Sequence, residues 1–343
     1  MPPRGLLLQW HITDRCNLRC THCYQEEYDG DDPPMERLCE VLRQYEDLLS
    51  FQRSQEPRRR IRGCVTVTGG EPFLHTDFWE LLEILAANRR SYHFAILTNG
   101  THIDRAAARR LRRLRPAFVQ LSIEGTEATH DAIRGDGNFR RTTEAARRLV
   151  KNGIRTLISF SAHQGNYREF PHVARLGRRL GVARVWADRV LPFGSGKSLK
   201  TQLLTPEQTR EFFDLMRVER LAARKRWFCR TEIAMHRALQ FLATGAAPYR
   251  CTAGDSLVAV LPNGDLLPCR RMPIRVGNLF EMPLRTLYYE SDLFTALRDR
   301  GRISAGCEGC SHATSCRGGL RCLSYATTGD PFVADPGCPI LPM

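Results

Sequence analysis

The 343-residue sequence contains no long hydrophobic run. No apolar stretch approaches the ~18 residues that a membrane-spanning helix requires, and Leu6-Leu7-Leu8 is too short for the core of a signal peptide. We therefore expect a soluble, cytoplasmic protein without a membrane partner. A chain of this length can form one large α/β domain and a second, smaller one.

The lack of an export signal also decides how the thirteen cysteines are interpreted. In a secreted chain, this many cysteines would indicate disulfide bonds. Here most of them occur in groups with the short spacings of metal ligands, which favours reduced thiols. Cys39, Cys64 and Cys229 fit no such group and are expected to be small buried side chains.

Aromatic residues are missing from the arginine-rich segments. The net charge of +14 comes mostly from arginine, as in Arg58-Arg59-Arg60, residues 109–115 and Arg147-Arg148. Arginines at helical spacing usually form a solvated outer face, which is our default interpretation. A functional surface of this charge would suit an acidic peptide, an acidic electron-donor protein or RNA, and the lack of interleaved aromatics argues against RNA.

The first group of cysteines lies in the stretch from Trp10 to Tyr24, at the spacing C-x3-C-x2-C. Three thiolates on one short loop, Cys16, Cys20 and Cys23, can bind three irons of a cubane [4Fe–4S] cluster and leave the fourth iron open. Structural zinc is the alternative, but zinc needs a fourth, closing ligand. With Tyr24 directly after the last cysteine, the loop resembles the signature of the radical SAM enzymes, whose open iron binds the amino and carboxylate groups of S-adenosylmethionine (SAM).

A second motif follows a predicted buried strand over residues 62–68. Gly69 and Gly70 allow the backbone to approach a ligand closely, and Glu71 places a carboxylate at the carboxyl end of the strand. This segment resembles the GGE motif of radical SAM proteins, in which the motif binds the methionyl amino group of SAM.

Further strands are predicted to alternate with helices, over residues 93–98, 117–123, 155–161 and 184–190. This alternation indicates βαβ units around a parallel sheet. Counting the strand before the first cysteine, six units predict an α/β fold with an open, partial (β/α)6 TIM-like barrel instead of a closed barrel of eight. Because active sites of such barrels lie at the carboxyl ends of the strands, Cys16, Glu71, Asn99 and Ser122 are expected to converge.

The segment that follows residue 121 also resembles the radical SAM family. Carried over from the family, Ser122 contacts the ribose of SAM and Arg134 pairs with its carboxylate, while Asn99 and Tyr24 are further expected contacts with the cofactor. A capping hydroxyl and a surface charge are the alternatives for Ser122 and Arg134. Glu124 stands where the family more often has Asp.

Two other features carry less information. The glycine-containing turn over residues 192–196 could approach the adenine of SAM or form a plain surface loop. His11, His22 and His130 are expected to make local hydrogen bonds and not to bind metal.

The chain is expected to have three parts. A capped, amphipathic helix is predicted over residues 205–226, and a second helix over residues 232–244. Because the composition changes after these helices, we expect a barrel in residues 1–200, bridging helices in residues 201–248 and a small, cysteine-rich α+β domain in residues 249–343.

The last part of the chain contains seven cysteines, at positions 251, 269, 307, 310, 316, 322 and 338. Alternating apolar residues on both sides of Asn263-Gly264 predict a β-hairpin, which brings Cys251 and Cys269 together. The whole pattern resembles the SPASM domain, which binds two auxiliary iron–sulfur clusters. A zinc ribbon could account for Cys307 and Cys310 alone but not for all seven cysteines.

The resemblance also implies which cysteines bind each auxiliary cluster. The outer cluster is assigned four ligands: Cys307, Cys310, Cys316 and Cys338. The inner cluster, nearer to the substrate, is assigned three: Cys251, Cys269 and Cys322. The family usually has a further cysteine where this chain has Leu320, so an open iron, a ligand other than cysteine and a [2Fe–2S] centre all stay open for the inner cluster.

These resemblances imply a radical SAM oxidoreductase. One-electron reduction by a donor such as flavodoxin or ferredoxin would cleave SAM into methionine and a 5′-deoxyadenosyl radical, which abstracts a hydrogen atom from the substrate. Because the commonest substrate of SPASM proteins is a ribosomally made peptide or protein, we expect peptide maturation by oxidation or cross-linking. The sequence indicates no catalytic base.

Other functions are kept as alternatives. The second hypothesis is an enzyme of cofactor biosynthesis that acts on a haem-like or quinone precursor. An RNA-modifying or RNA-binding protein and a structural zinc module are alternatives from other classes. Because the first predicted strand lies so near the N-terminus, we expect a separate leader-binding protein, or the basic surface itself, to recruit a peptide substrate.

Overall fold

Ten strands form a single curved sheet within residues 5–58, 61–225 and 230–340, the ranges that the computed structural model describes. The strands are β1 (Leu7–His11), β2 (Gly63–Thr68), β3 (Tyr92–Thr98), β4 (Val119–Ser122), β5 (Thr156–Ala162), β6 (Arg184–Arg189), β7 (Glu232–Ala234), β8 (Leu257–Val260), β9 (Asp265–Leu267) and β10 (Gly277–Asn278). Their order across the sheet is β10-β9-β8-β1-β2-β3-β4-β5-β6-β7.

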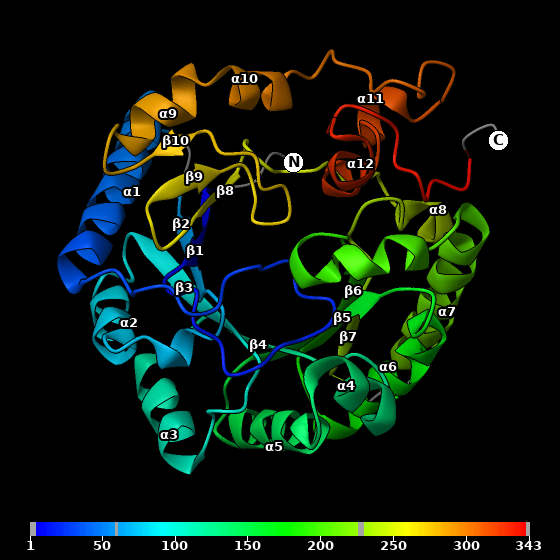
Figure 1. Cartoon of the computed structure of the whole chain (residues 1–343), viewed down its shortest axis with the longest axis horizontal. Coiled ribbons are helices and arrows are strands. Elements are labelled where there is room, and N and C mark those ends of the chain that lie inside the picture. Colours follow the sequence, from blue (N-terminus) through cyan, green and yellow to red (C-terminus); the bar gives the residue numbers. More distant parts are fainter. Residues whose placement is uncertain (1–4, 59–60, 226–229, 341–343) are drawn as a thin grey trace.

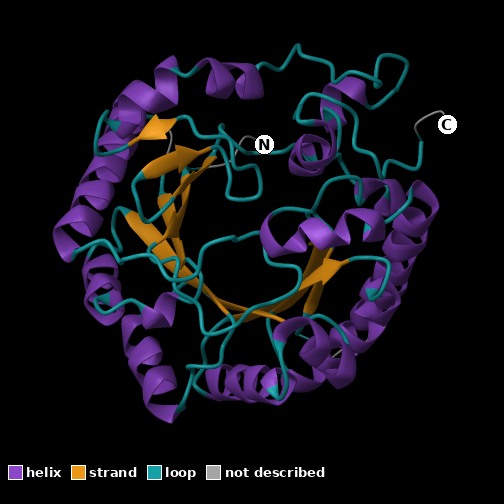
Figure 2. Cartoon of the chain, viewed as in Figure 1, coloured by secondary structure: helices purple, strands orange, loops and turns teal. Residues whose placement is uncertain are grey.

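Helices cover the outer side of this sheet, which bends into an open ring (Figures 1 and 2). The α-helices are α1 (Met35–Gln55), α2 (Phe78–Ala87), α3 (Arg105–Leu114), α4 (Glu127–Arg134), α5 (Asn138–Lys151), α6 (Phe170–Leu180), α7 (Pro206–Arg224), α8 (Phe241–Thr244), α9 (Leu284–Glu290), α10 (Asp292–Arg298), α11 (Ala313–Cys316) and α12 (Arg321–Thr328). The described ranges also contain the 3-10 helices η1 (Pro72–Leu74), η2 (Tyr167–Glu169) and η3 (Gly194–Gln202).

The strands β1 to β6 confirm the predicted partial barrel. They pair in parallel, with registers such as Leu7 opposite Cys64 and Leu157 opposite Arg184. Each of them is followed in the chain by a helix or a 3-10 helix, as expected for βα units. The carboxyl ends of all six strands therefore meet at one end of the ring, where barrels of this kind place their active sites.

Two strands extend the barrel beyond the predicted six. β7 pairs in parallel with β6, and β8 pairs in parallel with β1. The predicted hairpin over residues 256–268 is confirmed, because β9 runs antiparallel to β8 with Ala259 opposite Leu267. The C-terminal part of the chain thus shares one sheet with the barrel.

The second predicted bridging helix, over residues 232–244, was wrong. The chain forms the strand β7 there and only the short helix α8. Ile233 is buried because its strand pairs with the edge of β6, and Leu239 has a left-handed backbone (φ +66°) that a continuous helix excludes. The first bridging helix is confirmed as α7, whose predicted end at Arg226 lies outside the described residues.

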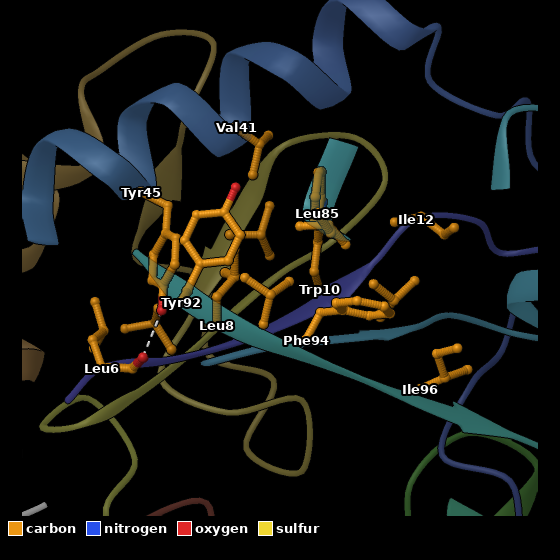
Figure 3. Packing of buried hydrophobic residues seen from close by; sticks show 14 of the residues in the cluster. Leu6, Leu8, Trp10, Ile12, Val41, Tyr45, Leu85, Tyr92, Phe94 and Ile96 are labelled. Atoms are coloured by element: carbon orange, nitrogen blue, oxygen red, sulfur yellow. Dashed lines mark hydrogen bonds between the residues drawn. The ribbon is translucent and has the colours of Figure 1, made fainter. Parts of the chain in front are cut away.

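Side chains alternate between the two faces of β1. Leu8 and Trp10 point to the outer side and pack, with Ile12 beyond the strand, among the residues of α1 and α2 (Figure 3). The Tyr45 hydroxyl on α1 donates to the carbonyl oxygen of Leu6 at 2.6 Å, which joins the helix to the strand. The alternation leaves Gln9 and His11 on the inner side of the ring.

The C-terminal segment closes the opening between the two edges of the ring (Figure 1). It packs first against α1, where the Gln44 side chain bonds to the backbone of Leu279 and Leu284 at 2.8 Å each. It ends beside β6 and α7, where Arg210 donates to the carbonyl oxygen of Pro339 at 2.9 Å. None of the described helices is long and apolar enough to cross a membrane.

Candidate active site

The loop between β1 and α1 brings three cysteine thiols together at the carboxyl ends of the strands. Cys20 is buried, and Cys16 and Cys23 are half-buried. Burial, and then the charges of the Glu71 carboxylate and of the Cys20 and Cys23 thiols, raise the pKa of Cys16 to about 11, although the Leu18 N–H opposes the shift. Thiols that lie so close and so far from water remain protonated unless a metal centre stabilises their thiolates, so the donor set fits an iron–sulfur cluster.

The paired glycines after β2 pack directly against this loop. A Cβ atom on Gly70 would contact the carbonyl oxygen of Arg15 and lie 2.7 Å from that of Asp14. The Gly70 N–H donates to the carbonyl oxygen of Thr13 at 2.9 Å, and the next N–H, of Glu71, donates to that of Arg15 at 2.8 Å. The close approach predicted for these glycines is therefore made to the backbone of the cysteine loop.

Glu71 joins the carboxyl ends of β2 and β3. Its fully buried carboxylate accepts the hydroxyl of Thr98 at 2.7 Å and the N–H of Asn99 at 2.8 Å. Burial raises the pKa of Glu71 to about 7, and these two hydrogen bonds oppose the shift. The group thus lies beside Cys16 and is poised between its neutral and charged forms near neutral pH.

Asn99 connects the end of β3 with the tip of the cysteine loop. Its side-chain N–H donates to the side-chain oxygen of Asn17 at 2.9 Å, and Asn17 donates to the hydroxyl of Thr101 at 2.9 Å. The carbonyl oxygen of Asn99 accepts the hydroxyl of Thr142 at 3.0 Å. Asn99 and Glu71 therefore lie together beside the cysteine loop, and their contacts with a cofactor stay a prediction.

Arg134, at the end of α4, points toward the same loop. Its guanidinium bonds to one carboxylate oxygen of Glu124 at 2.6 and 3.1 Å, and lies 3.8 Å from the sulfur of Cys20. Burial opposes the charged form of Glu124, but Arg134 and then His22 hold its pKa well below the usual range. Sequence reasoning did not predict this pairing, which places a fixed positive charge beside a candidate cluster ligand.

Ser122 lies at the end of β4, half-buried, with its hydroxyl 3.2 Å from that of Ser159 on β5. No hydrogen bond caps a helix with Ser122 in the described ranges, so the capping alternative is not supported. The structure thus brings Cys16, Glu71, Asn99 and Ser122 to the same end of the barrel.

The glycine turn over residues 194–196 also contacts the cysteine loop. A Cβ atom on Gly194 would lie 2.5 Å from the backbone of Tyr24 and Gln25, and Gly194 has a positive φ of +58°. The N–H of Gly196 donates to the carbonyl oxygen of Cys23 at 2.9 Å. The turn after β6 therefore holds the loop near Cys23, whereas Gly70 bonds to the start of the loop at Thr13.

Two of the three histidines make the expected local bonds. His22 lies 3.3 Å from the Glu124 carboxylate, and His130 accepts the N–H of Glu124 at 3.2 Å. All three rings have one nitrogen without a hydrogen-bond partner in the described residues, but buried His11 differs because its ring makes no side-chain hydrogen bond there at all. The ring of Tyr24 lies edge-on to His11, with the ring centroids 6.4 Å apart.

The four cysteines assigned to the outer auxiliary cluster line one pocket. This pocket has a volume of about 350 Å³, part of it open to solvent, and also contains Phe241 and Ala334. Burial is the main cause that raises the pKa of Cys307 to about 11 and of Cys316 to about 12. The pocket fits an inorganic cluster with four thiolate ligands: Cys307, Cys310, Cys316 and Cys338.

The three cysteines assigned to the inner cluster also lie together. Burial and the thiols of Cys269 and Cys251 raise the pKa of Cys322 to about 12, although the nearby Arg271 opposes the shift. Arg321 is 1% exposed, and its Nε and Nη2 atoms have no hydrogen-bond partner in the described part of the chain. An anionic cluster beside Cys251 would compensate this buried charge, so these residues fit such a group.

The position usually held by cysteine in the SPASM pattern is filled by a buried, apolar Leu320. Its N–H donates to the Asp335 carboxylate at 2.8 Å, and Asp335 is bound by both Nη atoms of Arg189 at 2.8 and 2.5 Å. Asp335 is therefore already engaged and offers no ready fourth ligand. In the described ranges no group of three or more His, Cys, Asp or Glu is arranged to hold a single metal ion.

The cysteines outside these groups differ from the expected small buried side chains. Cys39 on α1 is exposed, which corrects the prediction, because it lies on the outer face of that helix. Cys64 on β2 is half-buried. Cys229 lies outside the described residues.

Comparison with family models agrees with both sequence resemblances. The radical SAM superfamily model matches residues 10–176. The SPASM model, described as an iron–sulfur cluster-binding domain, matches residues 251–311, which include Cys251, Cys269, Cys307 and Cys310.

Curated relatives align with nearly the whole chain. The pre-heme d1 synthase of Dinoroseobacter shibae is 26% identical, with 96% of this chain and 85% of the relative covered. The mycofactocin maturase MftC of Mycobacterium tuberculosis is 29% identical, with 97% and 82% covered. The PqqA peptide cyclase of Streptomyces rochei is 27% identical, with 99% and 90% covered.

Solved structures share the fold. SuiB of Streptococcus suis bound to S-adenosylmethionine superposes with a TM-score of 0.76 at 18% identity, over 97% of this chain and 77% of that chain. The structure of anSMEcpe with bound AdoMet superposes with a TM-score of 0.76 at 19% identity, over 97% of this chain and 90% of that chain. These structures show the shared fold, and the two family models, in agreement with the three-cysteine loop over the barrel strands, show that the chain belongs to the radical SAM superfamily of enzymes and carries a C-terminal SPASM iron–sulfur cluster-binding domain.

Proposed function

We propose that this radical SAM enzyme modifies a ribosomally made peptide or protein by oxidation or cross-linking. The observation that carries the proposal is the three-cysteine loop, which backbone bonds from Gly70 and Gly196 hold over the carboxyl ends of the barrel strands. When bound, the iron–sulfur cluster and SAM supply the chemistry, since one-electron cleavage of SAM yields a 5′-deoxyadenosyl radical that abstracts a hydrogen atom from the substrate.

The residues of the chain bind and orient these groups. We assign the cluster to Cys16, Cys20 and Cys23, and contacts with SAM to the following set: Tyr24, Gly69, Gly70, Glu71, Asn99, Ser122 and Arg134. The hydrogen bonds of Glu71 and Asn99 keep the ends of β2 and β3 and the loop in one arrangement, which reduces the reorganisation needed on binding. Close backbone packing around the loop also excludes water from the site.

We further propose two auxiliary clusters and three functional parts of the chain. The four-cysteine pocket supports the outer cluster, and the Cys251, Cys269 and Cys322 group supports the inner one. The parts are the barrel of residues 1–200, the bridging segment of residues 201–248 and the SPASM domain of residues 249–343.

The peptide substrate is supported by relatives whose names state peptide maturation, the mycofactocin maturase and the PqqA peptide cyclase, and by SuiB, which was solved with the precursor peptide SuiA. A separate leader-binding protein would recruit the peptide. The electron donor is an acidic protein such as flavodoxin or ferredoxin, which suits the net charge of +14 and the exposed arginines on α3, among them Arg109, Arg112 and Arg113.

A second function has its own support. Relatives of similar identity are named pre-heme d1 synthase and AdoMet-dependent heme synthase, the latter 24% identical in Nitratidesulfovibrio vulgaris. The alternative is therefore a SPASM enzyme of cofactor biosynthesis that acts on a haem-like or quinone precursor.

The proposal is tested by 5′-deoxyadenosine formation in anaerobically reconstituted protein with SAM and dithionite. We expect product from the wild type and none from a variant with Cys16→Ala, Cys20→Ala and Cys23→Ala. Cys39→Ala is the matched control, because Cys39 is exposed on the outer face of α1 and belongs to none of the cysteine groups. Iron-loaded wild type that forms no 5′-deoxyadenosine, with candidate peptides or porphyrins present, would overturn the proposal.

A further inference from the structure

An arginine without a partner lies between the barrel and the SPASM domain. Arg270 directly follows Cys269, and its guanidinium carbon lies over the ring of Tyr24, 5.0 Å from the ring centre. Within residues 5–58, 61–225 and 230–340, its guanidinium has no hydrogen-bond acceptor and no carboxylate in ion-pair contact, and its Nε atom is buried. Arg270 acts on the pKa of Asp14 but makes no ion pair with it, so this partly buried cation lacks the contact with an anion that proteins usually provide.

Two neighbouring arginines of this interface are paired with a carboxylate. Arg271, the next residue, bonds to the Asp188 carboxylate and donates to the carbonyl oxygen of Arg189 at 2.8 Å. Arg237 reaches the same carboxylate at 3.3 Å. The Asp188 carboxylate therefore pairs with both of these neighbours, whereas the only contact that the structure gives the Arg270 guanidinium in the described residues is with the ring of Tyr24.

A second unpartnered group faces the same aromatic ring. His11 lies on the inner side of β1, is 1% exposed, and has no partner for its Nε2 atom among the residues that the structure describes. Burial, and then the charge of Arg270, lower its pKa well below the usual range. His11 is therefore neutral at physiological pH and can offer a hydrogen bond without adding charge.

The position of Tyr24 places both groups where a substrate would bind. Tyr24 follows Cys23 of the barrel loop, and after burial the charges that act on its phenol come from Arg270, Cys23 and Cys269. Its ring thus lies between the loop that is proposed to bind SAM and a ligand of the proposed inner cluster. In the proposed function, the hydrogen atom of the substrate must be presented in this space.

We propose that Arg270, assisted by His11, binds a carboxylate of the substrate and positions the substrate between the cysteine loop and the inner cluster. The planar guanidinium can bind both oxygens of a carboxylate, and the anion would provide the missing countercharge. The same group could come from an acidic side chain or C-terminus of a peptide, or from the acid side chains of a tetrapyrrole. This inference rests on the proposed function and specifies the substrate class of that site.

The test compares charged and neutral probes on reconstituted holoenzyme with SAM. The probes are coproporphyrin III and its tetra-amide, and a glutamate-containing synthetic peptide and its glutamine-containing, C-terminally amidated counterpart. Dissociation constants are measured for wild type, Arg270→Gln, Arg270→Lys and the control Arg110→Gln. Arg110 is a suitable control because it also lies over an aromatic ring, that of Trp79 at 4.5 Å, but on the outer helices.

We expect the wild type to bind at least one carboxylate probe more tightly than its neutral counterpart, and the probe that shows this preference names the source. Arg270→Gln should weaken carboxylate binding by roughly tenfold or more and leave the neutral form unaffected. Arg270→Lys should weaken carboxylate binding less than Arg270→Gln, since the positive charge remains and only the paired N–H donors of the guanidinium are lost. Arg110→Gln should match the wild type.

Three results would overturn the inference: no preference for a carboxylate in the wild type, equal weakening of charged and neutral probes by Arg270→Gln, and unchanged carboxylate binding in that variant. A weaker dissociation constant for SAM itself would assign Arg270 to SAM and would also overturn it. Formation of 5′-deoxyadenosine is measured in parallel. If the wild type forms this product but shows no carboxylate preference, the proposed function stands and the role of Arg270 falls.

Discussion

The packing of Gly70 against the cysteine loop leads to a strong prediction for Gly70→Ala. The new Cβ atom would overlap the carbonyl oxygen of Arg15 and lie 2.7 Å from that of Asp14, and both are backbone atoms that cannot rotate away. The loop must therefore move, which breaks the bonds from the N–H groups of Gly70 and Glu71 to the loop, 2.9 and 2.8 Å long.

The expected loss follows from these contacts. Overpacking a rigid site costs roughly 1–3 kcal/mol, and each lost backbone hydrogen bond costs about 0.5–1.5 kcal/mol. We therefore expect Gly70→Ala to lower the free energy of unfolding of the apoprotein by roughly 2–6 kcal/mol. Because the loop carries the three cysteines, the variant should also bind less iron on reconstitution and lose affinity for SAM.

Urea unfolding, iron analysis and SAM binding measure these effects. Gly30→Ala is the matched control, because the nearest atoms to its new Cβ would be those of Asp14 at 3.6 and 3.7 Å, an ordinary contact. The reasoning is refuted if Gly70→Ala unfolds within about 0.5 kcal/mol of the wild type and binds the same amounts of iron and SAM.

Three further predictions concern buried polar pairs. Glu124→Gln leaves the Arg134 guanidinium without its carboxylate and should lower the free energy of unfolding by about 3–5 kcal/mol near pH 7. The pKa of Glu124 is depressed in the folded state, so its contribution is present above its unfolded pKa of about 4.3 and is lost as the pH falls; urea unfolding should show the gap between wild type and variant narrowing below about pH 4. Arg189→Ala leaves the Asp335 carboxylate buried without its partner and should cost about 3–5 kcal/mol, with less iron bound on reconstitution, as measured by thermal unfolding and iron analysis. Tyr45→Phe removes one of the two donors to the buried carbonyl oxygen of Leu6, which keeps the N–H of Cys64, and should cost about 0.5–1.5 kcal/mol in urea unfolding.

Controls and contrary results are clear for each of these. Arg147→Ala, at a side chain that is 59% exposed, should change the free energy of unfolding by less than about 0.5 kcal/mol. A gap for Glu124→Gln that widens toward acid pH would contradict the assigned direction of its pKa. Full iron content in Arg189→Ala would show that the ion pair between Arg189 and Asp335 is not needed for binding of the outer cluster. An unchanged urea midpoint of unfolding for Tyr45→Phe would show that the Tyr45 hydroxyl does not stabilise the fold.

Local patterns predicted much of the fold and of the candidate site. The six βα units followed from the alternation of short apolar strands with amphipathic helices, and β1 to β6 confirm them. The hairpin around Asn263-Gly264 was predicted from its turn residues and is confirmed as β8 and β9. These features are encoded by residues close together in the chain, so they could be predicted without knowledge of distant contacts.

Features that depend on distant contacts were missed or misjudged. Residues 232–234 read as the start of a helix, but the open edge of β6 recruits them as a strand. For the glycine turn at 194–196, the sequence allowed both a contact with the adenine of SAM and a plain surface loop. The structure shows that the turn packs on the cysteine loop, a contact that the sequence of the turn does not encode. The inner position of His11 could have been found from the alternation of Leu8 and Trp10 with Gln9 on β1.

The sequence by itself determined the family and the cofactor chemistry, because the cysteine spacing and the motifs after the strands are local. Only the tertiary structure decided how the charges are paired. Arg270 and Arg271 are adjacent and identical in type, yet Arg271 is bound by Asp188, 83 residues away along the chain, and Arg270 makes no ion pair in the described residues. That difference depends on where the end of β6 meets the SPASM segment, since an ion pair forms only where folding brings its two groups within contact.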